Sequence, residues 1–167
     1  MSNIQYAFLE RSRVPSRPEL QASIDALGFD LQLHSGYAPF QDNGFLPFVL
    51  HGEDGPGFEI QFTTADALTV DDPGLKVIAA GRDHCISMAW HGSMKDLACV
   101  LIVSCALIQD FDAAVSYEGE APEPLESLLA AAREVLEEEK AKRDRPASQP
   151  ILPAKRPWWK LWSGRGT

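Results

Sequence analysis

The sequence predicts one domain of the α+β class followed by a short basic tail. Three observations carry this prediction: a capped helix pattern at residues 17–27, an alternation of apolar and polar side chains at residues 58–63, and an apolar run of helical length at residues 97–108. We expect an antiparallel or mixed sheet of about four to six strands. The apolar helix would pack on this sheet, with two amphipathic helices outside it.

The first part of the chain predicts a strand and then a helix. Residues 4–10 alternate loosely, as in a strand or an extended arm. Ser16 and Glu19 have the spacing of a capping box, in which each side chain bonds the backbone N–H of the other residue, and Pro18 lies where no amide donor is needed. Gly28 is placed to end this helix because glycine adopts positive φ readily.

The middle of the chain predicts a hairpin. Residues 45–51 and 58–63 are its expected strands, and residues 53–57 are its expected turn because their Gly and Pro residues favour a reversal. Pro47 lacks the amide proton that a central strand uses. We therefore expect its strand to lie at a sheet edge or to be bulged at that residue.

Two more strands are expected at residues 75–80 and 84–90, before the apolar helix. One side of the second strand carries His84, Ile86, Met88 and Trp90. Ser93 is placed to cap the helix that contains residues 97–108, and this helix is apolar on nearly all sides, so other elements must cover it. A run of this length is too short to cross a bilayer, which takes about 20 residues.

The last part of the domain predicts a short strand at residues 112–117, an exit turn at 118–120 and a final helix at about 124–142. The apolar stripe of that helix consists of Leu125, Leu128, Leu129, Ala132 and Leu136. We place the domain at residues 1–143 and a flexible tail at residues 144–167, where prolines prevent a helix or a strand.

Charge is distributed unevenly along the chain. The net charge of −9 divides into −16 for residues 1–139 and +7 for residues 140–167, where eight Lys or Arg accompany one acid. A body this acidic repels nucleic acid and anionic membranes and attracts basic partners. We therefore expect no nucleic-acid partner.

The sequence contains no motif for catalysis, a metal or a cofactor. It has no C-x-x-C or H-x-x-x-H pair, and His84 and His91 would point to opposite faces of one strand. No G-x-S-x-G motif is present, and the three cysteines (Cys85, Cys99 and Cys105) have apolar neighbours typical of small core residues. We expect no catalytic residues, no metal and no cofactor. A small enzyme using loop carboxylates, or His51 and His91, is a third alternative.

The tail has a composition typical of an anchor. Three tryptophans lie close to cationic side chains, and the anchor residues are Arg156, Trp158, Trp159, Lys160 and Trp162. Such a segment can bind a membrane interface, a groove on another protein, or the acidic domain of its own chain. The sequence leaves these three alternatives open.

The order of the elements resembles that of small bacterial α+β proteins. The resemblance covers about residues 45–140: a strand-rich half, Trp90-His-Gly-Ser93 leading into the buried helix that ends at Ala106-Leu107, a short strand and an amphipathic helix. Several such proteins act as immunity proteins against polymorphic or contact-dependent toxins. The Pro-Trp-Trp-Lys-Leu-Trp segment also resembles the ends of proteobacterial proteins.

The resemblance and the charge together predict a non-enzymatic immunity protein that binds and occludes a cognate toxin. Its protein partner would be a basic toxin domain, because an acidic protein associates rapidly with a basic cleft. The expected contact residues are the paired loop acids Glu53, Asp54, Asp71, Asp72, Glu118 and Glu120. The first residues carry no signal-peptide pattern, so we expect a cytoplasmic protein.

The alternative function is a peripheral adaptor that the tail attaches to a membrane or a protein complex. In that case the full chain should float with vesicles that contain anionic lipid, whereas a version ending at Arg145 should not, because Trp and Lys or Arg side chains supply the affinity for the interface. Equal flotation of the two proteins would contradict membrane attachment.

Overall fold

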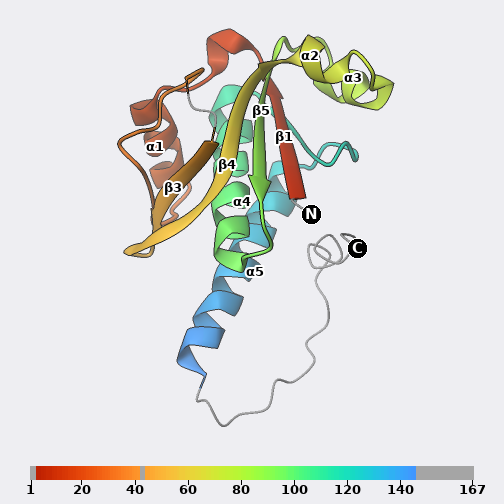
Figure 1. Ribbon diagram of the computed structural model, residues 1–167. Helices are drawn as coiled ribbons and strands as arrows, with labels where there is room; N and C mark the ends of the chain where they lie inside the picture. The colour runs from red at the N-terminus through yellow and green to blue at the C-terminus, as the bar shows by residue number, and fades with distance from the viewer. Residues whose placement is uncertain (1–2, 42–43, 146–167) are drawn as a thin grey trace.

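The computed structural model describes residues 3–41 and 44–145, which form an antiparallel sheet covered by helices (Figure 1). The strands are β1 (Asn3–Leu9), β2 (Leu31–Leu33), β3 (Gly44–Leu50), β4 (Glu53–Thr64), β5 (His84–Trp90) and β6 (Ala114–Tyr117). The helices are η1 (Arg11–Arg13), α1 (Arg17–Ala26), α2 (Ala65–Thr69), α3 (Pro73–Ala79), α4 (Met94–Phe111) and α5 (Leu125–Asp144). The predicted α+β class is confirmed.

The strand order is β2-β3-β4-β5-β1-β6, and all neighbouring strands are antiparallel. The N-terminal strand β1 therefore lies inside the sheet, where Ala7 pairs with Ile86 of β5 and with Val115 of β6. The two edge strands, β2 and β6, are the shortest of the six, with 3 and 4 residues.

Helix α4 occupies the centre of the core. Every residue from Leu97 to Leu107 is buried, because the sheet lies on one side of the helix and α1 and α5 lie on the other (Figure 1). Its polar residue Ser104 is satisfied there: the hydroxyl donates to the Val100 carbonyl at 2.7 Å and accepts from the Gln5 side chain at 3.0 Å. The predicted covered helix is confirmed.

The two amphipathic helices outside α4 also follow the sequence pattern. The capping box of α1 is present, with the Ser16 hydroxyl accepting from the Glu19 amide and the Glu19 carboxylate accepting from the Ser16 amide. In α5 the fully buried residues are Leu128, Ala131, Ala132 and Val135. The expected Leu125, Leu129 and Leu136 are only partly buried at the margins of this stripe.

Residues 75–80 are not a strand, as the sequence predicted, but most of helix α3. The Asp72 carboxylate accepts from the Leu75 amide at 3.0 Å, and Pro73 is the first helical residue, so the segment begins with two strong helix-starting features. The apolar residues Leu75, Ile78 and Ala79 then have helical spacing, and they pack with Phe8 and Cys85 on the second face of the sheet.

The predicted turn of the β3–β4 hairpin is also wrong. The chain reverses at His51 and Gly52, whose φ values of 51° and 79° suit a two-residue hairpin turn, and residues 53–57 belong to β4. The expected bulge at Pro47 is confirmed by a register shift between Pro47 and Val49. Gly55, Pro56 and Gly57 of the predicted turn therefore lie in β4, at this register shift.

Replacing Gly57 tests how closely the bulge is packed. A Cβ atom at this residue would lie 2.2 Å from the backbone oxygen of Leu46, so Gly57→Ala forces the two strands apart. We expect it to lower the free energy of unfolding in urea by about 1–3 kcal/mol. Gly36→Ala is the control: its Cβ would meet mainly the His34 side chain, at 3.2 Å, and should change stability much less. Equal losses would contradict this account.

Candidate functional site

The two faces of the sheet are covered unequally. Helices α1, α4 and α5 pack on one face, whereas α2 and α3 cover only one end of the other (Figure 1). We call the uncovered remainder of the second face the open face. The alternation of side chains along the strands assigns to it Ile4, Tyr6, Phe45, Pro47, Val49, Asp54, Glu59, Gln61, Ser87 and Ala89.

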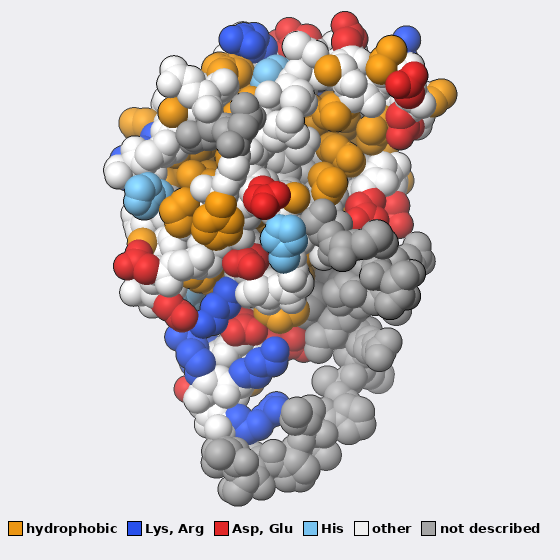
Figure 2. Space-filling view, in the orientation of Figure 1, with side chains coloured by type: hydrophobic (Ala, Val, Ile, Leu, Met, Phe, Trp, Pro, Cys, Tyr) orange, Lys and Arg blue, Asp and Glu red, His pale blue; other side chains and the backbone are white. Residues whose placement is uncertain are grey.

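The open face combines exposed apolar side chains with acids. Phe45 is 57% exposed, and it pairs across the strands with the exposed Glu59. Figure 2 views this side of the molecule and shows two areas of hydrophobic side chains separated by polar and acidic ones. A shallow hollow of about 340 Å³ lies in the middle, lined by Ile4, Gly44, Glu59, Ile60, Gln61, Ser87 and Ala89.

Cationic side chains are absent from the sheet itself. None of the six strands between Asn3 and Tyr117 contains a Lys or an Arg. The His91 side chain lies beside the face, with its Nε2 3.5 Å from the Glu59 carboxylate. The open face is therefore apolar and negatively charged.

The neighbouring acids Glu53 and Asp54 point to opposite sides of β4. Asp54 pairs with Val49 and so lies on the open face, whereas Glu53 pairs with Leu50 and reaches toward α4. There its Oε1 lies 2.6 Å from the Nζ atom of Lys95. The hydrogen bond from this ammonium group lowers the pKa of the Glu53 carboxyl.

The other predicted acids lie at the start of α3 (Asp71 and Asp72) and in the turn after β6 (Glu118 and Glu120). Burial raises the pKa of the Tyr6 hydroxyl, and electrostatic interactions with Cys85, Glu118 and Asp72 raise it further. Gly119 adjoins Leu75 of α3, so the turn after β6 lies against that helix. Asp71 is exposed at the start of α3, and the Glu120 carbonyl accepts from the Ser116 hydroxyl at 2.6 Å.

The six predicted contact acids thus do not form one cluster. Asp54 lies on β4, Glu118 follows the edge strand β6, where its amide donates to the Ile4 carbonyl at 3.0 Å, and Asp72 caps α3, while Glu53 faces away. Sequence reasoning missed Glu59, which lies on the open face. The signal was available, because Glu59 alternates with the buried Phe58 and Ile60 and had to face solvent.

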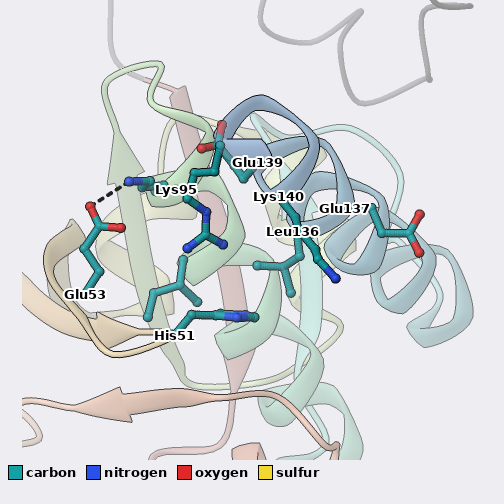
Figure 3. Close-up of a pocket in the computed structure, with 9 residues that line it drawn as sticks. His51, Glu53, Lys95, Leu136, Glu137, Glu139 and Lys140 are labelled. Atoms are coloured by element: carbon teal, nitrogen blue, oxygen red, sulfur yellow. Dashed lines mark hydrogen bonds and ion pairs between the residues drawn. The ribbon is translucent and has the colours of Figure 1, made fainter. Parts of the chain in front are cut away.

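A second cavity lies between α5 and the β3–β4 turn (Figure 3). Its volume is about 210 Å³, and its lining residues are Leu50, His51, Glu53, Lys95, Leu136, Glu137, Glu139, Lys140 and Arg143. Figure 3 shows Glu53 and Lys95 pointing toward each other at one side, and Glu137 pointing away. Acids and cations are balanced around an apolar floor, so this cavity does not favour one sign of ligand charge.

The groups that could perform nucleophilic or metal chemistry are separated. Within residues 3–41 and 44–145, no three His, Cys, Asp or Glu side chains lie close enough together to hold a metal ion. The three cysteines are free and buried. Burial raises the pKa of the Cys85 and Cys105 thiols to about 12 and raises that of Cys99 as well, so all three are protonated at neutral pH.

His84 is buried under an aromatic cover. Its ring lies 5.2 Å from that of Phe40 and 6.5 Å from that of Phe62, and the Arg11 guanidinium lies over Phe40 at 4.1 Å. Its Nε2 atom has no hydrogen-bond partner in the described part of the chain. Burial lowers the pKa of His84, Arg11 lowers it further, and Asp83 offsets part of this shift.

Comparisons with protein families, with curated proteins and with solved structures found no significant match to this chain. No helix among residues 3–41 and 44–145 is long and apolar enough to span a membrane. The tail residues Arg156, Trp158, Trp159, Lys160 and Trp162 lie outside the described residues. Function must therefore be inferred from the chemistry of the described surface.

The buried His84 should make stability depend on pH. Its folded pKa lies below the unfolded value of about 6.5, so its contribution is complete above that pH and is lost as the pH falls toward the folded pKa. We expect the free energy of unfolding to fall between pH 7 and pH 5, and to fall less in His84→Gln, which cannot gain the proton. Parallel pH curves for the two proteins would contradict this role.

Proposed function

We propose that this chain is a non-enzymatic binding protein whose open face accepts a basic surface of another protein. The observation that supports this most directly is the composition of the face: apolar side chains, the acids Asp54 and Glu59, and no Lys or Arg in any of the six strands. An apolar centre with a charged margin is typical of a protein interface.

The distribution of the acids matches a broad partner better than a small ligand. Asp54 lies on β4 and Glu118 follows the edge strand β6, with β5 and β1 between these strands, and the hollow on the face is shallow and open. A small molecule would need a deeper cavity to bury most of its surface. A protein can instead bury Phe45 and Ile4 while its cations contact the acids around them.

The most concrete form of this proposal is an immunity protein that covers the basic cleft of a toxin. Enzymes that act on nucleic acid need such clefts because they bind phosphates with Lys and Arg. The net charge of −16 in residues 1–139 would steer such a toxin toward this protein. The partner to test is the protein encoded immediately upstream, if its C-terminal domain is a basic toxin.

Charge changes on the open face should weaken that complex. We expect Asp54→Lys combined with Glu59→Lys to raise the Kd at least tenfold, or by about 1.4 kcal/mol, mainly through slower association at low salt. Asp72→Asn is the suitable change at the start of α3, because asparagine keeps the helix cap while removing the charge. Surface-based kinetic measurements at two salt concentrations would report both effects.

The matched control is Asp30→Lys. Asp30 is an exposed acid that lines a hollow with Arg133 and Glu137 of α5, on the helix-covered side of the sheet. It makes the same change in net charge per residue without touching the open face. The proposed surface is wrong if Asp30→Lys weakens binding as much as Asp54→Lys or Glu59→Lys does alone. It is also wrong if the open-face variants bind as tightly as the unaltered protein.

A further inference from the structure

We infer that the tryptophan-rich segment Trp158–Trp162 of this chain docks on the open face of its own domain. The proposal concerns a contact within one molecule and goes beyond the binding of a partner. It gives the face an internal occupant that any partner has to displace, so the tail would regulate access to this surface.

The chemistry of the segment complements that of the face. Residues 146–167 contain four cations, Lys155, Arg156, Lys160 and Arg165, and no acid. The open face offers Asp54 and Glu59, with no cation in the strands beneath. Tryptophan rings can lie on exposed Phe45 and on the small residues around Ser87, where they would lose contact with water.

The segment is long enough to reach this surface. Arg143, near the end of α5, lines a cavity together with His51 and Glu53, so this end of the helix and the β3–β4 turn lie on the same side of the domain. Residues 146–157 can span up to about 40 Å when extended. From Asp54 at that turn to Gln61 in the middle of β4, the strand covers roughly 23 Å.

The cavity beside α5 is a poorer place for the same segment. It is closer to Arg145, but the cations Lys95, Lys140 and Arg143 balance its acids, and Glu53 is already paired with Lys95. The cations of the tail would therefore meet no excess of negative charge there. The strands of the open face carry acids and no Lys or Arg, so the open face is the better match.

A fluorescent label on the open face can detect the contact in the full chain. We would attach bimane, which tryptophan quenches only at short range, to Gln61→Cys, since Gln61 is exposed on this face. The native thiols are buried and protonated, so they should not react. The matched site is Ala22→Cys, exposed on α1 on the helix-covered side.

Each labelled protein is compared with its counterpart carrying Trp158→Phe, Trp159→Phe and Trp162→Phe, which keeps the segment apolar but removes the quenchers. At position 61 we expect at least twofold lower emission with the tryptophans than without them, unchanged by dilution and relieved by salt. At position 22 the bimane emission should be the same with and without the tryptophans. Should Gln61→Cys disturb the sheet, Ser87→Cys on β5 provides a second site on the same face.

Three results would overturn the proposal. Equal emission of the pair at position 61 means that the segment is not on the face. Equal quenching at positions 61 and 22 means that it contacts the surface without preference. Quenching that disappears on dilution means that a second copy supplies the tryptophans. Because no partner is present, these outcomes are independent of the proposed function, which the charge variants test separately.

Discussion

The burial of helix α4 is the constraint on which the rest of the molecule depends. Every residue from Leu97 to Leu107 is buried, so other parts of the chain must supply apolar surfaces on all sides of this helix. Burying side chains such as Leu101 and Ile102 stabilises the fold by about 1.5–3 kcal/mol each. The sheet provides one surface and α1 and α5 provide the other. All three long helices are thereby used on one side, and only the short α2 and α3 remain for the opposite face.

The open face is thus a consequence of how this core is built. Its position also explains why a partner would choose the face rather than an edge of the sheet. The edge strands β2 and β6 have 3 and 4 residues, so they offer few unpaired backbone groups to another strand. In the proposed complex the contacts would therefore be made by side chains, and the acids on this face would favour a basic partner.

Local chemistry made most of the elements predictable, and tertiary pairing decided the exceptions. The capping box of α1 and the apolar run of α4 act within a few residues, so both were read correctly. The turn of the predicted hairpin was placed wrongly because Gly55 and Pro56 resemble a turn, while the actual reversal at His51 is fixed by pairing across β3 and β4. The hydrogen bond between Glu118 and Ile4 of β1 joins segments far apart in sequence, and no local pattern reveals it.

The place of β1 inside the sheet has a consequence for how the protein is made. Both neighbours of β1 come late in the chain, since β5 begins at His84 and β6 ends at Tyr117. During synthesis the first strand leaves the ribosome long before either neighbour exists, and contacts between distant segments form slowly. Phe8 and Leu9 are fully buried in the folded domain. Until β5 and β6 have been synthesised, these side chains stay exposed to solvent or to a chaperone. The order of translation therefore sets a period of vulnerability to aggregation.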